Sequence, residues 1–378
     1  MILTALGLNL ATPGELRADR PVPGQVGMFR NYKFQMFRSI AKRAAIQSSL
    51  GLINLLQLPK LLPNAGGRGI IFTLHHVRPS RHKYFDPNRH LSITPEFLDA
   101  AIGVCKDAGL TAVALEALPA LLADPRETRK FVCFTLDDGY RDNLLFAAPV
   151  FQKHAVPYTV FITPGFISRE RTIWWETVEK LLTNVSSISF DFGKGPETLA
   201  CAKRDAKITA FDRIANYVES ASEDIAVNEI DRVAKANGVD AMAIVEEEIM
   251  THEELHELLM DPLASLGAHT MTHPNLKRVG DARLREELSQ SAAITSGYTG
   301  RPVTSLSYPY GGRRAVGARE TKAARDVGFA IAVTTQPGVL SSHSLREPTA
   351  VNRVPLNGYY QKPNYVRALI SGLPFRFA

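Results

Sequence analysis

Short apolar runs alternate with longer amphipathic stretches along this chain, and that alternation most limits how it can fold. The runs at 131–136, 263–268 and 303–308 have the length of strands, and each ends in polar residues. Strands that alternate with helices indicate a parallel sheet. The carboxyl ends of parallel strands share one face, so residues distant in sequence can meet there. We therefore expect an α/β fold whose sheet closes, or nearly closes, into a barrel.

The breaker cluster at residues 63–67 predicts the main boundary of the chain. It divides an N-terminal extension, residues 1–66, from a catalytic domain at 67–378. Within that domain the alternation of strands and helices is interrupted at about 176–250, where the sequence is charged and helical in pattern apart from a strand at 187–192. We interpret this stretch as an insertion over or beside the site. Elsewhere helix signals are clear, as at Thr94-Pro95, a cap followed by proline at the first helical position.

The composition is that of an ordinary globular protein. Of 378 residues, 45% are hydrophobic and 22% charged, and the three cysteines are too widely spaced for a zinc motif. The formal net charge of +6 comes without a long basic run or a nucleic-acid motif, so we expect no nucleic-acid partner. The first residues lack the basic leader of a secretory signal, which favours a cytoplasmic location.

Residues 29–62 of the extension interleave apolar and basic residues at helical spacing. Such a helix could lie on an anionic membrane surface, which would make the protein membrane-associated. It could equally pack its apolar face on the catalytic domain. The pattern alone leaves both interpretations open.

Four side chains at strand ends suggest a metal-dependent hydrolase. Asp137 and Asp138 follow one apolar run, while His269 and His273 follow another. Two adjacent carboxylates repel each other unless a cation compensates them. Histidines four residues apart bring their rings to one side if the strand end turns into helix. Asp138, His269 and His273 form an N2O set suited to one divalent ion, Zn²⁺ or alternatively Co²⁺ or Ni²⁺, with positions left for water and substrate.

A competing zinc motif, H-E-x-x-H, is formed by His252 and His256. Thr251 and Glu254 have the spacing of a capping box, which places His252 in the first exposed turn of a helix. We therefore expect an ordinary capped helix here and no protease site.

Taken together, three segments resemble the motifs of the polysaccharide deacetylase family, also called the NodB-homology domain or carbohydrate esterase family 4. The segments are Phe134-Thr135-Leu136-Asp137-Asp138-Gly139-Tyr140, His269-Thr270-Met271-Thr272-His273 and Ser307-Tyr308-Pro309-Tyr310-Gly311. The resemblance covers about residues 68–356. It implies a distorted (β/α) barrel, with a helical insertion and an N-terminal helical extension in this chain.

The resemblance also implies roles for individual residues. It makes Asp138, His269 and His273 the metal ligands, Asp137 the general base, and the backbone N–H of Tyr310 a donor to the oxyanion. Tyr140 and Pro309 of the motifs are candidates for substrate contact. Apart from the resemblance, Trp174 and Trp175 follow a strand-end loop and could stack on a sugar ring, or one of the two could pack in the core.

Two positions depart from the usual family pattern. The late leucine-x-histidine motif that supplies the acid is missing, and the segment 71–77 instead resembles a rearranged branch with the acid histidine on the first strand, which makes His75 the candidate acid. Ser307 stands where the family often has an arginine that orients the base. Arg353 could replace that arginine, or could form an unrelated structural ion pair.

The leading hypothesis is a carbohydrate N-deacetylase that releases acetate from an N-acetylated glycan or glycoconjugate. An amidase or deformylase acting on a lipid-linked sugar is the nearest alternative, and the basic amphipathic extension supports it. A non-catalytic carbohydrate-binding protein on the same scaffold is a third. The intact pair of acids argues against that last reading, because a pure binder has little need of a general base. No protein partner is predicted.

Overall fold

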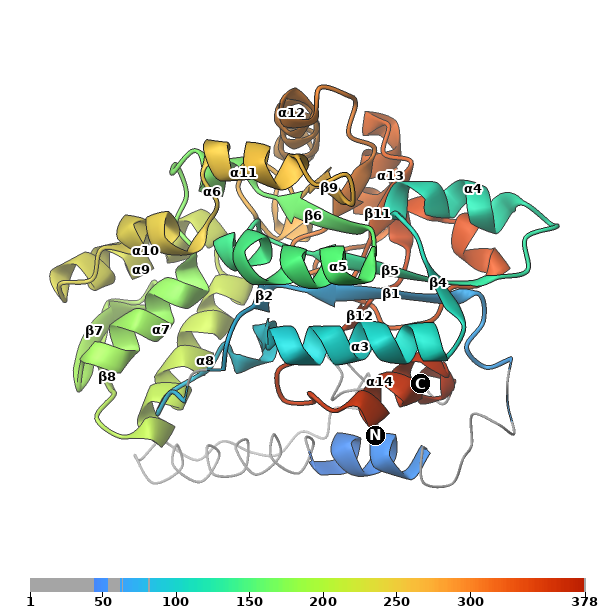
Figure 1. Ribbon diagram of the computed structural model, residues 1–378. Coiled ribbons are helices and arrows are strands. Elements are labelled where there is room, and N and C mark those ends of the chain that lie inside the picture. Colours follow the sequence, from blue (N-terminus) through green and yellow to red (C-terminus); the bar gives the residue numbers. More distant parts are fainter. Residues whose placement is uncertain (1–43, 54–61, 63, 81, 377–378) are drawn as a thin grey trace, which may run out of the picture.

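A curled, all-parallel sheet forms the centre of the molecule in the computed structural model, which describes residues 44–53, 62, 64–80 and 82–376 (Figure 1). Seven strands follow one another across it in the order β11-β10-β9-β6-β5-β1-β12, and β4 pairs with the start of β5. Their bounds are β1 Gly69–Leu74, β4 Leu110–Ala112, β5 Lys130–Leu136, β6 Tyr158–Ile162, β9 Ala264–Ala268, β10 Ser305–Ser307, β11 Ile331–Val333 and β12 Val354–Pro355. The expected α/β architecture is confirmed.

Residues 351–355 close the sheet into a barrel. Val351 bridges Val333 of β11, and three residues later Val354 pairs with Phe72 of β1. The two ends of the strand order are therefore joined through one short segment. Inside the barrel, apolar side chains pack as one cluster: Ile71, Phe131, Cys133, Phe161, Ile331, Val333 and Val351, together with residues of the loop after β4 and of α4 Leu118–Ala123.

Helices cover the outside of the barrel, most of them where the sequence predicts (Figure 1). They are α3 Pro95–Asp107, α5 Ala148–His154, α6 Pro164–Ile167, α11 His252–Leu259, α12 Asp281–Thr299, α13 Ala318–Val327 and α14 Pro363–Ile370. Thr94 caps α3 as expected, accepting the N–H of Phe97. A short π-helix, Asn143–Ala147, leads into α5. A small two-stranded sheet pairs β2 His76–Val77 with β3 Ser92–Ile93.

The segment between β6 and β9 forms a helical lobe beside the barrel, on the left in Figure 1. It contains α7 Trp174–Asn184, the hairpin β7 Ser187–Asp191 and β8 Pro196–Ala200, then α8 Arg204–Ser220, α9 Glu223–Ala236 and α10 Ala241–Glu248. The second strand of the hairpin has no counterpart in the sequence expectation, since only one of its five residues is buried and no apolar run marks it. We call residues 174–248 the insertion.

Only part of the amphipathic N-terminal segment can be assessed. Within residues 44–53, which are helical, Ile46, Leu50 and Ile53 are buried in the main hydrophobic core. This part packs on the catalytic domain, while the rest of residues 1–61 lies outside the described residues. Among the described helices, none combines the length and the apolar character needed to cross a bilayer.

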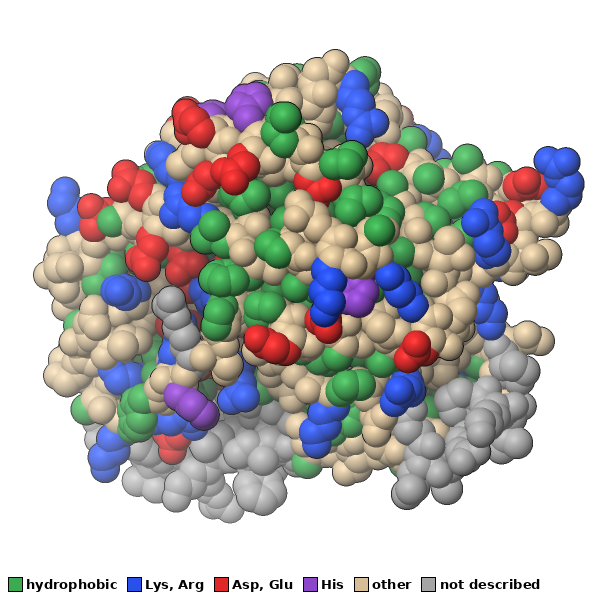
Figure 2. All heavy atoms as spheres, viewed as in Figure 1, with side chains coloured by type: hydrophobic (Ala, Val, Ile, Leu, Met, Phe, Trp, Pro, Cys, Tyr) green, Lys and Arg blue, Asp and Glu red, His purple; other side chains and the backbone are tan. Residues whose placement is uncertain are grey.

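Charged side chains of both signs are spread over the face shown in Figure 2. Basic residues are scattered there and form no continuous patch. Acidic residues gather over α10 and α11, two helices rich in glutamate. The basic side chains on this face therefore do not gather in one patch.

Replacing Gly267 of β9 with valine should destabilise the barrel. A Cβ at Gly267 would lie 2.4 Å from ring atoms of Phe161 and 2.8 Å from Ser305 Oγ. Overpacking of this kind costs about 1–3 kcal/mol. Urea unfolding measures it, and Gly297→Ala is the control, because that α12 position is open and alanine there should be neutral or stabilising. Equal stability of G267V and wild type would show that the barrel interior is loosely packed.

Candidate active site

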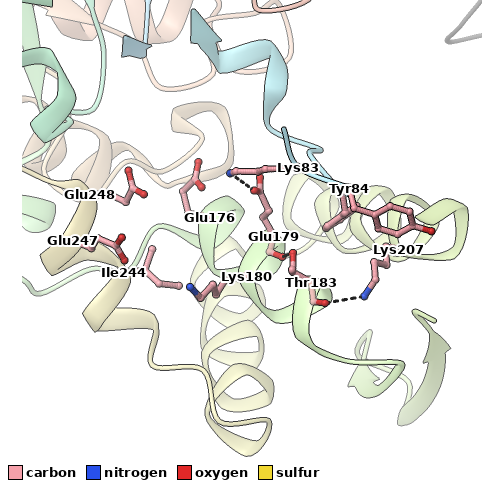
Figure 3. A pocket seen from close by; sticks show the side chains of 11 residues that line it. Lys83, Tyr84, Glu176, Glu179, Lys180, Thr183, Lys207, Ile244, Glu247 and Glu248 are labelled. Carbon is pink, nitrogen blue, oxygen red and sulfur yellow. Dashed lines mark hydrogen bonds and ion pairs between the residues drawn. The ribbon is translucent and has the colours of Figure 1, made fainter. Parts of the chain in front are cut away.

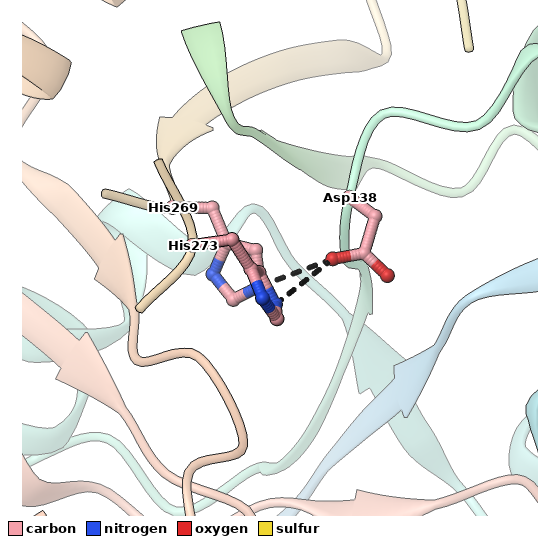
Figure 4. A group of neighbouring side chains, drawn as sticks. All are labelled: Asp138, His269 and His273. Carbon is pink, nitrogen blue, oxygen red and sulfur yellow. Dashed lines mark ion pairs between the residues drawn. The ribbon is translucent and has the colours of Figure 1, made fainter. Parts of the chain in front are cut away.

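The three expected metal ligands come together at the carboxyl ends of β5 and β9. Asp138 Oδ1 lies 3.3 Å from His269 Nε2 and 3.4 Å from His273 Nε2 (Figure 4). All three residues are buried, and their ligand atoms lie within 4.8 Å of one another. Asp138 reaches this position in a left-handed backbone conformation, φ +75°, directly after the strand.

The two histidines meet through a loop and not through a helical turn, the condition under which their spacing would bring the rings together. Residues 269–275 form no regular element, and both Thr270 and His273 have positive φ, +61° and +60°. The His273 N–H donates to Thr270 Oγ1 at 3.0 Å, which stabilises the turn. Together with Asp138 and Tyr310, these make four of the six non-glycine residues with positive φ in the described chain. Such backbone strain concentrates at functional sites.

The protonation of the histidines suits metal binding. His269 Nδ1 lies 2.7 Å from the Ser307 carbonyl oxygen, to which it can only donate, so Nε2 is the nitrogen available to a metal. Burial lowers the pKa of His273 to about 3, which keeps that ring neutral. Asp138 Oδ1 has no hydrogen-bond partner among the described residues although it is buried. A buried carboxylate oxygen facing two imidazole nitrogens fits a divalent cation.

Asp137 is held by Arg353 in a buried, two-pronged ion pair. The Arg353 Nη1 and Nη2 atoms lie 2.8 Å and 2.7 Å from Asp137 Oδ1 and Oδ2. Ser307 Oγ donates to Oδ2 at 3.1 Å and accepts from Arg353 at 2.7 Å. Burial by itself would raise the pKa of Asp137, but the Arg353 guanidinium outweighs it and holds that pKa well below its ordinary value. The contact suggested for Arg353 is present.

Tyr310 lies beside the metal-ligand set with its own network. Its hydroxyl donates to Glu223 Oε1 at 2.5 Å and accepts from Trp174 Nε1 at 3.1 Å, while its carbonyl accepts from Thr335 at 2.7 Å. Within the described residues no hydrogen bond is recorded for its backbone N–H. Its ring centre lies 5.3 Å from that of His273. The N–H is therefore available to an incoming oxygen atom.

A cleft of about 1700 Å³ opens over these groups. His75, Asp137 and Asp138 lie in its wall, and so do Trp174 and Trp175 of the insertion. Burial lowers the pKa of His75, although the Asp138 and Asp137 carboxylates oppose the shift. The size suits several sugar units.

Two residues expected at the substrate surface lie elsewhere. Tyr140 is fully buried, its ring against His76 and its hydroxyl accepting from Trp175 Nε1 at 2.9 Å. Pro309 is also buried, and neither residue belongs to the cleft wall. Both occupy motif positions whose side chains turn into the core, so direct substrate contact by either is not supported.

The H-E-x-x-H segment is a capped helix, as predicted. The Thr251 hydroxyl accepts from the Glu254 N–H, and the Glu254 carboxylate accepts from the Thr251 N–H. His252 and His256 are exposed. They form no metal-ligand group with other acids in the described part of the chain.

Sequence reasoning missed several residues that build the site. The sequence marked Ser307 only as the position where the usual arginine is missing, but its hydroxyl bridges Asp137 and Arg353. Glu223 of α9 orients Tyr310 by accepting a hydrogen bond from its hydroxyl. Glu223 lies in the insertion, whose charged helices carry no local signal of a site. Burial raises the pKa of Glu223 above its ordinary value, although the Tyr310 hydrogen bond opposes the shift.

Comparison with known proteins agrees with this geometry. The family model described as polysaccharide deacetylase matches residues 202–332, a range that includes both histidine ligands and Tyr310. The match begins inside the insertion and does not include Asp137 or Asp138. No curated protein sequence was similar enough to be counted as a relative.

Solved structures similar to this chain include two described as deacetylases and the protein IcaB. The deacetylase PplD of Streptococcus pyogenes, in complex with acetate, has 16% identity and a TM-score of 0.53, covering 80% of this chain and 98% of its own. IcaB from Ammonifex degensii has 16% identity and a TM-score of 0.50, covering 81% and 97%. A de-N-acetylase from Aggregatibacter actinomycetemcomitans has 12% and 0.50, covering 79% and 99%. At such identities the likeness establishes a shared fold.

Arg353→Met should destabilise the protein strongly. It leaves Asp137 charged and buried without a partner, which costs about 3–5 kcal/mol. Asp137→Asn in the same chain should recover much of that loss, because the unpaired charge is then gone. Urea unfolding of wild type, both single variants and the double variant measures the coupling.

The stability difference between wild type and R353M should depend on pH. Because the folded-state pKa of Asp137 is depressed, its stabilising contribution is present above the unfolded value of about 3.9 and is lost as pH falls. In R353M the unpaired carboxylate instead protonates readily, so the gap between R353M and wild type should narrow toward pH 4. A gap that stays constant with pH would contradict the charge-based explanation.

Proposed function

We propose that this chain is a metal-dependent hydrolase that removes N-acetyl groups from an amino sugar in a glycan or glycoconjugate, in keeping with the polysaccharide deacetylase family model that matches residues 202–332. The observation that carries the proposal is the pairing of an ionised acid, Asp137, with the adjacent set Asp138, His269 and His273 at the floor of the cleft. Acids and neutral imidazoles in this arrangement fit amide hydrolysis better than simple sugar binding.

Asp138, His269 and His273 would hold the divalent ion, with zinc the first choice and cobalt or nickel as alternatives. Such an ion, when bound, supplies a Lewis acid for the amide carbonyl and lowers the pKa of water. The metal's identity rests on the donor set, one carboxylate and two imidazoles.

Asp137 is the proposed general base. It is ionised, it stands next to the ligand Asp138, and Arg353 and Ser307 fix its orientation. A positioned carboxylate of this kind takes the proton from an attacking water. The ion pair keeps Asp137 deprotonated and turned toward the ligand set.

Two further groups complete the reaction. The backbone N–H of Tyr310 would donate to the oxygen that becomes negatively charged, and its alignment depends on Glu223 and Trp174 through the side chain. His75, in the cleft wall beside Asp137 and Asp138, would give a proton to the leaving amine. Trp174 and Trp175 offer aromatic faces to the sugar ring.

A second candidate substrate, a sugar linked to lipid through phosphate, is favoured by the charge of the cleft rim. Lys277, Arg278, Arg313 and Arg314 line one part of the cleft, and Glu219 is the acidic residue beside them. Arg313 is exposed, and its side chain makes no hydrogen bond or ion pair within the described residues. Cations of this kind suit phosphate oxygens.

Two aspartate variants should separate metal binding from catalysis. Asp138→Ala should lose both bound metal and acetate release, since it removes a ligand. Asp137→Asn should keep the metal but lose about 10²–10⁴-fold in turnover, because the base is gone. The assay measures acetate released from N-acetylglucosamine oligomers by apo protein reloaded with zinc, cobalt or nickel.

His256→Ala is the matched control for these variants, since it removes an exposed histidine of α11 and should change neither metal content at the ligand set nor turnover. Full turnover by purified D137N would exclude Asp137 as the base. Glycan binding without acetate release under any of the three metals would favour the non-catalytic alternative.

Arg313→Glu tests the second candidate. If the rim recognises phosphate, this change should raise KM for a phosphate-linked N-acylated sugar about tenfold or more while kcat on neutral oligomers stays at the wild-type level. Steady-state assays with both substrates give the comparison. An equal effect on both substrates would argue against recognition of phosphate by the rim.

A further inference from the structure

A second group of acids with a histidine lies between the barrel and the insertion. His76, Asp142 and Glu248 each offer a ligand atom within 4.8 Å of the others, and Glu176 Oε1 lies 3.4 Å from His76 Nε2. We call these four residues the second cluster. They come from β2, from the residue before the π-helix, and from α7 and α10. The cluster shares no residue with Asp138, His269 and His273.

The histidine of the second cluster is oriented as metal-binding histidines are. His76 Nδ1 lies 2.6 Å from Asp142 Oδ2, and the other Asp142 oxygen accepts from the Val77 N–H at 3.1 Å and from Asn143 at 3.0 Å. With a proton on Nδ1, the lone pair of Nε2 faces Glu176. A carboxylate that takes the far N–H of a ligating histidine is a recurrent partner in metal sites.

Two buried atoms at the centre of the cluster lack hydrogen-bond partners. They are His76 Nε2 and Glu176 Oε1, in residues only 0% and 7% exposed. Their separation of 3.4 Å repeats the 3.3 and 3.4 Å between Asp138 and its two histidines. Ligand atoms bound to one ion at about 2.0–2.2 Å in a tetrahedral arrangement are separated by roughly this distance.

The charge balance of the cluster also calls for a cation. Asp142, Glu176 and Glu248 bring three carboxylates, whereas the permanent positive charge against them is Arg78, whose Nη1 lies 3.1 Å from Glu248 Oε2. A divalent ion would balance the remaining two negative charges. Burial raises the pKa of Glu248 although Arg78 and His76 oppose it, which is the behaviour of a carboxylate short of positive charge.

A cavity gives this cluster a path to solvent. Glu176 and Glu248 line a cavity of about 360 Å³ at the insertion, and Figure 3 shows the two carboxylates on the same side of it. The nearby Lys83 pairs with Glu179 at 2.5 Å, and at longer range it also lowers the pKa of Glu176. The cavity leaves room for an ion to enter and for water to complete its coordination.

We propose that the second cluster binds a second divalent cation of the zinc or manganese class, with His76 and Glu248 as ligands, Asp142 orienting the histidine and Glu176 beside His76 Nε2. The ion joins the barrel to α7 and α10. It also steadies the cleft wall, because the Tyr140 ring lies 3.6 Å from the His76 ring and the Tyr140 hydroxyl accepts from Trp175 Nε1. The role is structural and separate from the hydrolytic site.

The competing occupant is a proton on His76 Nε2. Burial alone would lower the pKa of His76, but Asp142 raises it to about 9, so an imidazolium is the alternative state. That state still leaves one excess negative charge, and it places the Nε2 proton donor 3.4 Å from Glu176 Oε1 without a hydrogen bond. Counting bound ions distinguishes the two occupants.

The test is a metal count on the full chain stripped with chelator, reloaded with Zn²⁺ or Mn²⁺ and passed through gel filtration. All proteins carry His256→Ala, because the exposed His252 and His256 of α11 can also take zinc. We expect two ions per chain without further change, one in D138A, one in E248Q and none in D138A/E248Q. Glu247→Gln, an exposed neighbour in the same cavity, is the matched control and should retain two.

A second measurement does not depend on the folding of E248Q. Zn²⁺ or Mn²⁺ should raise the thermal unfolding midpoint of D138A/H256A, in which the hydrolytic site has lost a ligand. One ion in the H256A protein and none in D138A/H256A, with no metal-dependent shift, would overturn the second site. That result would leave the proposed deacetylase function intact, since acetate release is assayed separately.

Discussion

The buried pair of Asp137 and Arg353 connects the closure of the barrel to the chemistry of the site. Neither charge can remain in so dry a place without the other, and their two parallel hydrogen bonds satisfy both. Arg353 lies in the segment 351–355 that joins β11 to β1. Closing the sheet therefore delivers the cation to the end of β5. A barrel left open at this seam would lose its last parallel pairing and would also leave Asp137 without its ion-pair partner.

The strand-end positions of the site could be predicted because parallel topology forces them together. Asp137, Asp138 and His269 each follow an apolar run, and those runs became β5 and β9 of one sheet, with β6 between them. Arg353 was a candidate because it could replace the arginine that the family motif often has at the position of Ser307. By contrast, β4 and β12 have only three and two residues, too few for any periodic pattern to register. Their existence depends on long-range pairing.

The loop that carries the histidines shows where spacing misleads. The spacing of four positions from His269 to His273 fits one helical turn, which would bring both rings to one side. The structure instead uses left-handed residues at Thr270 and His273, stabilised by the Thr270 hydroxyl. The backbone conformation of this loop is set by the need to bring three side chains to one point, and local sequence propensities do not show such a requirement. Tyr140 shows a different error: it belongs to a motif and was expected to contact substrate, but its side chain packs beneath the site.

The barrel and the insertion contribute different kinds of side chain to the cleft. The barrel supplies the acids and imidazoles, whereas α7 and α8 supply Trp174, Trp175 and Phe211 to the cleft wall. His76 and Asp142 meet Glu176 and Glu248 at the junction, from positions spread over more than 170 residues, so no local motif announces the cluster. The junction nevertheless bears directly on the site, because Glu176 follows Trp175 in the chain. The proposed second cation would lie at this junction, next to the aromatic wall of the cleft.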